Sequence, residues 1–184
     1  ILEPIMASFG IMVGLPLSGK STVSRKLKKE GWVVINPDTY RQVQANTDHY
    51  VLLPPALEGQ IWRCVELTIS ALLRGGYNVV LDSTSLDKAT RTRWRRIANR
   101  EGSEFIIFFL RPDPDLSLRR NRDIRRFVDE KGNPDDSVIL RMFSKYREPD
   151  PSEGSIVDVA YEGDQVIFKE RSVERGGIPI LWKG

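Results

Sequence analysis

The stretch that decides the fold is Gly14-Leu15-Pro16-Leu17-Ser18-Gly19-Lys20-Ser21-Thr22. It follows an apolar run at residues 9–13 that is typical of a buried strand, and the pattern of residues 21–29 predicts a helix. A loop of the form Gly-x-x-x-x-Gly-Lys-Ser between a strand and a helix is the pattern of a phosphate-binding loop. A plain glycine-rich turn would explain the glycines, but it would not explain Lys20 and Ser21 directly after them.

The loop and the start of the next helix are expected to bind a nucleoside triphosphate. Gly14 and Gly19 allow backbone conformations that a Cβ atom disfavours, so that backbone N–H groups can point at phosphates. The positive end of the following helix adds to this attraction. Lys20 can reach the β- and γ-phosphates, and the Ser21 hydroxyl is suited to bind Mg²⁺. The residues expected to hold ATP or another NTP, with Mg²⁺, are Gly14, Ser18, Gly19, Lys20, Ser21 and Thr22.

Length and composition indicate one soluble globular domain. The 184 residues are 40% hydrophobic and 29% charged, and no apolar run is long enough to cross a bilayer, so we expect no membrane partner. Residues 1–6 lack the basic and apolar regions of a secretory signal. Cys64 is the only cysteine, which excludes an intramolecular disulfide and favours a reducing compartment, the cytoplasm. His49 is the only histidine, which excludes a histidine-pair metal site and disfavours a Ser-His-Asp hydrolase.

Positive charge is concentrated in one part of the chain. The net charge is only +3, yet eleven arginines and no lysine fall between Arg91 and Arg126. A guanidinium group matches phosphate oxygens with two parallel hydrogen bonds, which an ammonium group cannot do, so phosphates are the partner that this bias predicts. A solvated helix face is an equally good interpretation for Arg93, Arg95, Arg96 and Arg100.

Strand and helix patterns alternate along the chain, which predicts an α/β fold: a doubly wound parallel sheet with flanking helices and a small C-terminal β-hairpin. The predicted strands are residues 9–13, 32–35, 77–81, 105–110, 156–161, 165–169 and 178–182. The predicted helices are residues 21–29, 56–74, 113–126 and 135–146, with Asp113 as a cap and Pro114 at the first helical position. We expect a kinase domain at residues 1–150 and a β-rich extension, packed on the same domain, at residues 151–184.

Polar residues follow three of the predicted strands, at the edge where parallel sheets bind ligands, and one of these segments is Arg111 with the arginine-rich helix after the fourth strand. Asp38 and Arg41 lie one helical turn apart after the second strand, and Asp82-Ser83-Thr84-Ser85 follows the third. Asp38 is therefore a candidate general base, and Arg41 suggests an acceptor that carries phosphate. Other interpretations stay open: Asp38 could cap a helix that starts at Thr39, and Asp82 could support Lys20 or Mg²⁺.

Several short motifs occur in a specific order and spacing. They are residues 14–22, Ile35-Asn36-x-Asp38-x-Tyr40-Arg41, Asp82-x-Thr84-Ser85-Leu86, Arg91 with Trp94, Arg120-Asn121, and the helical pattern at residues 135–146. Together they resemble the kinase module of the phage polynucleotide 5′-kinases over most of residues 8–149. The resemblance implies that Asp38 is the general base for a 5′-hydroxyl and that Arg41 holds the 3′-phosphate of the acceptor. It also implies an acceptor pocket lined by Asp82, Ser83 and Thr84.

The resemblance further implies a lid helix whose arginines clamp the phosphates of ATP. Residues 116–127 crowd five arginines, and we expect this segment to be a mobile lid. The family pairs two lid arginines one turn apart, but the residue four positions after Arg120 is Ile124. The residues expected at the ATP phosphates are therefore Arg120, Arg122 and Arg125, and those expected to be solvated or packed by their stems are Arg119 and Arg126.

The expected activity is transfer of the γ-phosphate of ATP to the 5′-hydroxyl end of RNA or DNA, with Asp38 and Lys20 among the catalytic groups. Residues 151–184 contain no Asp-x-Asp-x-Thr motif, so we expect no 3′-phosphatase activity. Two alternatives remain. The chain could be a P-loop kinase for a small molecule, or a nucleic-acid-binding module that is gated by nucleotide and catalyses nothing.

Overall fold

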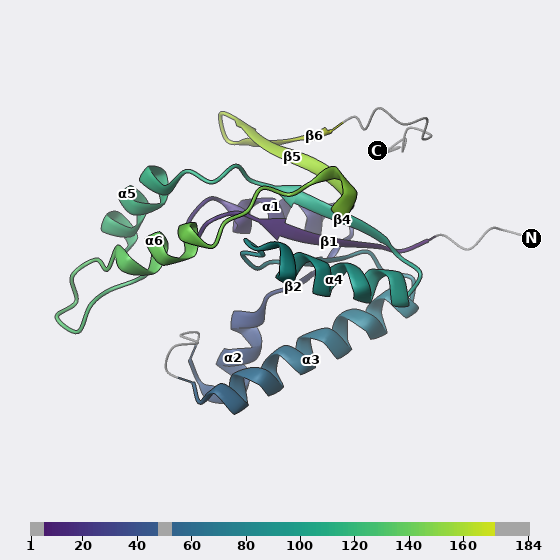
Figure 1. Cartoon of the computed structure of the whole chain (residues 1–184), viewed down its shortest axis with the longest axis horizontal. Helices are drawn as coiled ribbons and strands as arrows, with labels where there is room; N and C mark the ends of the chain where they lie inside the picture. Colours follow the sequence, from purple (N-terminus) through teal and green to yellow (C-terminus); the bar gives the residue numbers. More distant parts are fainter. Residues whose placement is uncertain (1–5, 48–52, 172–184) are drawn as a thin grey trace, which may run out of the picture.

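The structure is a computed structural model that describes residues 6–47 and 53–171 (Figure 1). Its strands are β1 (Ser8–Val13), β2 (Val33–Ile35), β3 (Val79–Leu81), β4 (Glu104–Phe109), β5 (Ser155–Glu162) and β6 (Gln165–Glu170). Its helices are α1 (Lys20–Lys29), α2 (Pro37–Ala45), α3 (Pro55–Arg74), α4 (Lys88–Arg100), α5 (Pro114–Ile124), α6 (Ser137–Ser144) and the short 3₁₀ helix η2 (Pro151–Glu153).

The strands form one sheet in the order β2-β3-β1-β4-β5-β6. The neighbours from β2 to β5 are parallel, and only the last pair, β5 and β6, is antiparallel. The predicted α/β fold with a mostly parallel sheet and flanking helices is therefore confirmed. Because β1 lies between β3 and β4, the loop that follows β1 leaves the middle of the sheet at its carboxyl edge.

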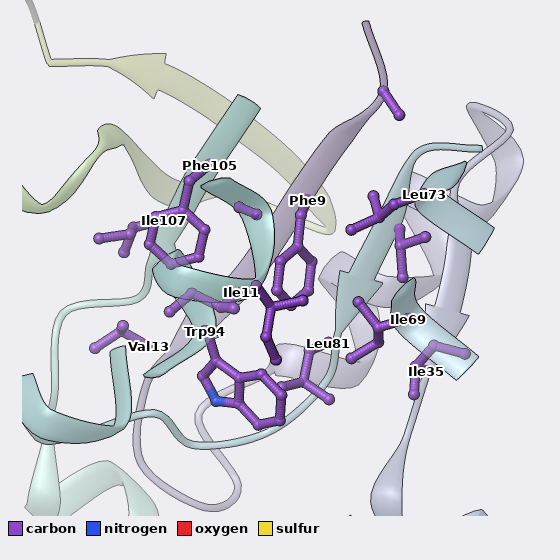
Figure 2. Close-up of a cluster of buried hydrophobic side chains, with 14 of the residues drawn as sticks. Phe9, Ile11, Val13, Ile35, Ile69, Leu73, Leu81, Trp94, Phe105 and Ile107 are labelled. Atoms are coloured by element: carbon purple, nitrogen blue, oxygen red, sulfur yellow. The ribbon is translucent and has the colours of Figure 1, made fainter. Parts of the chain in front are cut away.

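Side chains of the central strands alternate between the two faces, which gives the sheet a core on each side. On one face, Phe9 and Ile11 of β1 pack with Ile107 of β4 against α3 and α4. Trp94 of α4 is the largest side chain that is fully buried, and its ring meets the ring of Phe9 edge to face at 6.2 Å (Figure 2). This layer holds α4 against β1 and fixes the direction in which β1 leads into the loop.

The opposite face is covered by α1, and strands β5 and β6 add side chains to this layer. Met12 of β1 and Phe108 of β4 pack there with Leu27 of α1 and Trp32. Gly10 is needed at this point of β1, because a Cβ atom on it would lie 2.6 Å from Cε2 of Phe108. The two ends of α1 are thus tied to the sheet, one by the loop and the other by this apolar layer.

The predicted C-terminal hairpin is confirmed, and it extends the main sheet. Residues of β5 pair in parallel with β4, from Ile106 opposite Ser155 to Phe109 opposite Asp158. The turn to β6 contains Gly163 at a φ of 60°. The predicted strand at residues 178–182 lies outside the described residues. Within the described part of the chain, no helix is long and apolar enough to cross a membrane.

Several predicted boundaries were wrong by one or two residues. The strands β2 and β3 begin later than predicted, because the N–H groups of Trp32 and Tyr77 instead close the ends of the preceding helices by donating to the carbonyls of Leu27 and Leu72. At α5, the cap on Asp113 is confirmed by a 2.8 Å hydrogen bond from the N–H of Leu116. The helix ends at Ile124 and does not reach residue 126.

Candidate active site

The phosphate-binding loop joins β1 to α1, and Gly19 is the residue at which the helix begins. Gly19 has a φ of 103°, a left-handed conformation that residues with a Cβ rarely adopt. Nζ of Lys20 donates to two carbonyls of the loop, that of Gly14 at 3.2 Å and that of Leu15 at 2.6 Å. Burial lowers the pKa of Lys20 to about 8, and the charges of Asp82 and Asp38 partly oppose this shift.

Two features of the loop fit a phosphate group. Oγ of Ser18 is buried and has no hydrogen-bond partner among the described residues, so it is ready to donate to an anion. A Cβ atom on Gly14 would lie 2.8 Å from that same oxygen and 3.1 Å from Cβ of Leu110, so these side chains leave little room for another one there. By contrast, the hydroxyl of Thr22 accepts a 3.1 Å hydrogen bond from the exposed side chain of Arg25, and Thr22 does not line the cavity that lies beside the loop.

Ser21 and Asp82 both line the cavity beside the loop. Oδ2 of Asp82 accepts a 2.7 Å hydrogen bond from Ser24 of α1, which holds its carboxylate close to the start of the helix. In residues 6–47 and 53–171, no group of three or more His, Cys, Asp or Glu side chains could hold a metal ion. Mg²⁺ commonly takes one or two protein ligands and completes its shell with nucleotide phosphates and water. The Ser21 hydroxyl, supported by Asp82, suits such a site.

The cavity beside the loop has a volume of about 570 Å³ and is formed by five parts of the chain. These are the loop with the start of α1, the start of α2, one face of α3, the segment after β3, and the region from the end of α5 to α6. The predicted site residues that line it are Gly19, Lys20, Ser21, Asp38, Arg41, Asp82, Ser83 and Thr84. Its apolar wall is made of Trp62, Phe127, Val138 and Met142.

Asp38 faces this cavity and does not cap α2. The cap is Asn36, whose Oδ1 accepts a 2.8 Å hydrogen bond from the N–H of Asp38, and the helix begins at Pro37. The interpretation of Asp38 as a cap is therefore wrong. Its carboxylate instead contacts two guanidinium groups, with Oδ1 at 2.6 Å from Nη1 of Arg41 and Oδ2 at 3.4 Å from Nη2 of Arg126.

Arg41 is buried and is held by two carboxylates. Its Nε donates to Oε2 of Glu58 at 3.0 Å, and its Nη2 donates to the other oxygen of the same side chain. Glu58 is fixed in turn by Nε1 of Trp62 at 2.8 Å. Burial alone would lower the pKa of Arg41, but the hydrogen bonds and charges of Glu58 and Asp38 raise it above its ordinary value. Arg41 therefore orients Asp38 and presents little free surface.

The arginines of the predicted lid differ in how they contact the loop and the cavity. Nη1 of Arg120 donates to the carbonyl of Leu17 in the loop at 2.6 Å. Arg122 points to Asp136 at 3.4 Å with 62% of its side chain exposed, and Arg125 is the exposed residue that ends α5 in a left-handed conformation. Neither lines the cavity, whereas Arg126 does. The expectation that Arg126 is solvated or packed by its stem was wrong because α5 ends at Ile124, so helical spacing cannot locate the residues beyond it.

The arginines of α4 mostly bind other parts of the same chain. Arg91 is fully buried and forms two hydrogen bonds with Glu153, at 2.8 and 3.0 Å. Arg93 pairs with Glu66, and Arg95 donates to the carbonyl of Ser152 at 2.7 Å. These contacts are a third possibility beside phosphate binding and a merely solvated face. Arg91 also donates to the carbonyl of Leu86 at 2.9 Å. It therefore holds the segment after β3, whose first residues line the cavity.

The sequence did not indicate some residues of the cavity. Glu58 and Trp62 lie one turn apart on α3, and only the spacing of a carboxylate and an indole could have suggested that they act together. Phe127 falls in the predicted lid, and Val138 and Met142 fall in the predicted helix at residues 135–146. Their place in the cavity follows only from the fold.

Known proteins share this architecture. A family model described as an AAA domain matches residues 10–149. A chain of the Pnkp1/Rnl/Hen1 RNA repair complex aligns with a TM-score of 0.65 and 24% identity over 76% of this chain, which spans 44% of that chain. Kti12 of Chaetomium thermophilum, in complex with ADP-AlF3, aligns with a TM-score of 0.62 and 19% identity, covering 84% of this chain and 89% of that one.

A small-molecule kinase is also similar. The APS kinase CysC of Mycobacterium tuberculosis, in complex with AMPPNP and APS, aligns with a TM-score of 0.53 and 23% identity over 79% of this chain and 85% of that chain. These three likenesses show the fold alone, whereas the family match covers most of the sequence. The chain therefore belongs to the AAA domain family, and it is a P-loop kinase-type nucleotide-binding domain.

Proposed function

We propose that this chain transfers the γ-phosphate of ATP to the 5′-hydroxyl end of RNA or DNA. The observation that carries the proposal is the carboxylate of Asp38, which shares one cavity with Lys20 of the phosphate-binding loop and is oriented by Arg41. Phosphoryl transfer needs positioned reactants, neutralised charge and a group that accepts the acceptor's proton. These residues supply the last two.

Each residue has a defined part in this proposal. Bound ATP and Mg²⁺ supply the phosphoryl group and much of the charge neutralisation. Lys20 places a positive charge at the phosphates, and the Ser21 hydroxyl helps to hold Mg²⁺. Asp38, whose carboxylate contacts the guanidinium groups of Arg41 and Arg126, accepts the proton of the acceptor hydroxyl. In this proposal the lid arginines that contact the nucleotide are Arg120 and Arg126. Arg120 donates a hydrogen bond to the loop, and Arg126 lines the cavity.

Three features support a nucleic-acid end as the acceptor. The cavity is partly lined by apolar side chains, which suit a base or sugar, and Arg41 contributes a cation beside the general base. The sequence pattern around Asp38 and Arg41 resembles that of polynucleotide 5′-kinases. One similar structure is a chain of an RNA repair complex, although this chain spans less than half of it, so the activity of that assembly does not carry over directly.

The proposal is tested by incubating the protein with γ-labelled ATP, Mg²⁺ and matched 5′-hydroxyl RNA and DNA strands, beside a panel of small alcohols. We expect label on the strands and none on the small alcohols. Asp38→Asn is expected to retain ATP binding and to lower turnover by roughly 10²-fold or more, the loss expected for a general base. Asp115→Asn, on the exposed start of α5, is the matched control and should turn over normally.

One observation favours a second candidate, a kinase for a small molecule. Arg41 is already paired with Glu58 and Asp38, so an acceptor phosphate would have to compete with two carboxylates for it. Preferential labelling of a small alcohol would support that candidate over the polynucleotide kinase. Tight ATP-dependent binding of oligonucleotides without any labelled product would instead indicate a binding module.

A further inference from the structure

The C-terminal hairpin contacts the phosphate-binding loop through one side chain. Oη of Tyr161, near the end of β5, donates a 2.9 Å hydrogen bond to the carbonyl of Gly19, a residue 142 positions earlier in the chain. The ring lies so close that a Cβ atom on Gly19 would be 2.4 Å from the hydroxyl oxygen and 3.1 Å from Cζ. The left-handed backbone favours glycine at this position, and a Cβ atom there would also displace the end of the Tyr161 side chain.

The contacted carbonyl belongs to the peptide unit that starts α1. It also accepts hydrogen bonds from the N–H groups of Thr22 at 2.9 Å and Val23 at 3.4 Å. In a planar trans peptide, the carbonyl and the next N–H point in opposite directions. A contact that fixes the carbonyl of Gly19 therefore also fixes the direction of the Lys20 N–H, which is one of the unpaired donors at the start of the helix.

Tyr161 can act in this way because the hairpin is itself held firmly. Its strand β5 pairs with β4 inside the main sheet, and Tyr161 lies opposite Val166 of β6. A second carbonyl of the loop, that of Leu17, accepts a hydrogen bond from Arg120 of α5. Two carbonyls of the loop therefore accept hydrogen bonds from other elements, one from β5 of the sheet and one from α5 of the predicted lid.

We propose that Tyr161 is a positioning residue of the phosphate site, and that the hairpin sets the conformation in which the loop binds nucleotide. The inference deepens the proposed function and rests on one part of it, the binding of ATP at the loop. A tyrosine hydroxyl that braces the loop should act on nucleotide affinity and leave acceptor binding unchanged, because Tyr161 does not line the cavity that contains Asp38.

The test compares wild type with Tyr161→Phe, which keeps the ring and removes the hydroxyl, and with Tyr77→Phe as an exposed control far from the loop. We expect the Kd of Mg-ATP, measured by calorimetry, to rise about 2- to 12-fold in Tyr161→Phe, which is the loss of one ordinary hydrogen bond. The KM of the acceptor should stay unchanged, and the Tm should fall by no more than about 6 °C, as for any lost hydrogen bond. Hydrogen exchange at the amide of Lys20 should quicken in the same variant.

An unchanged affinity for Mg-ATP would overturn the inference. A lower Tm together with that unchanged affinity would assign Tyr161 to the stability of the hairpin. The Kd of Mg-ATP is measured without any acceptor, so its outcome does not depend on which acceptor the protein uses. Wild-type protein that binds Mg-ATP but labels no acceptor would contradict the proposed function alone, and the affinities of the two proteins would still decide the role of Tyr161.

Discussion

Replacing Glu153 with glutamine is expected to destabilise the fold strongly. Glu153 of η2 and Arg91 of α4 form an ion pair in which 5% and 0% of the two side chains are exposed. The pair joins α4 to the segment before β5, and Arg91 also holds the carbonyl of Leu86. Removal of the negative charge leaves a buried guanidinium group without its counter-charge.

Breaking a buried pair by removing one partner costs about 3–5 kcal/mol in the free energy of unfolding. For a chain of this length, each kcal/mol lowers Tm by roughly 2–4 °C, so the expected shift is roughly 6–20 °C. The matched control is Glu66→Gln, which removes the carboxylate partner of Arg93 in a pair with 52% of the arginine side chain exposed. An exposed pair contributes about 0–1 kcal/mol, so the control should shift Tm by at most about 4 °C.

The assay is urea unfolding followed by circular dichroism, with linear extrapolation to water, and a thermal scan of the same samples. Equal free energies of unfolding for Glu153→Gln and Glu66→Gln would refute the reasoning. That outcome would mean that water or another group replaces the lost charge, and that burial of this pair does not determine the stability of the fold.

Three other predictions concern the loop, the sheet and the acceptor site. Burial lowers the pKa of Lys20 to about 8, and bound phosphates favour its charged form. Above pH 8, binding of Mg-ATP should therefore take up a proton, and the affinity should fall by up to about tenfold per pH unit. Calorimetry in buffers of different ionisation enthalpy checks this, and a constant affinity from about pH 7 to 10 would contradict it. Gly10→Ala should lower the free energy of unfolding by about 1–3 kcal/mol, because its Cβ would meet Phe108 at 2.6 Å; Gly59→Ala on α3, with no atom within 4 Å, is the control and should be neutral or slightly stabilising. Arg41→Lys should lower kcat for every acceptor, because an ammonium group cannot hold Glu58 with two hydrogen bonds and Asp38 with a third, so that Asp38 loses its orientation; an unchanged kcat would rule out this role.

Those parts of the fold that depend on local patterns could be predicted from the sequence. The loop at Gly14 to Thr22, the strands around it and the cap on Asp113 each depend on residues within one or two turns of each other. The post-strand positions of Asp38 and Asp82 followed from the parallel sheet, because all its carboxyl ends meet at one edge. These predictions needed no contact between distant segments.

The features that could not be predicted depend on where an element ends or on what it meets. The role of Arg126 changed because α5 ends two residues before it, at a left-handed Arg125 that no sequence rule for glycine would indicate. The partner of Arg41 is on α3, and the partner of Gly19 is on the last hairpin. The sequence showed charged and aromatic residues in each segment, but the packing of the segments selected which of them face each other.

The position of β1 in the sheet has a consequence for the order in which the protein can mature on the ribosome. The phosphate-binding loop is made early, but its strand lies between β3 and β4, and β4 ends only at Phe109. At a synthesis rate of about 5–20 residues per second, roughly 90 further residues take on the order of 5 to 20 s. During that interval β1 lacks at least one of its two neighbouring strands, so the loop that follows it is supported from one side at most. Nascent chains stalled before β4 is made should therefore fail to bind nucleotide, although the whole glycine-rich motif is already present in them.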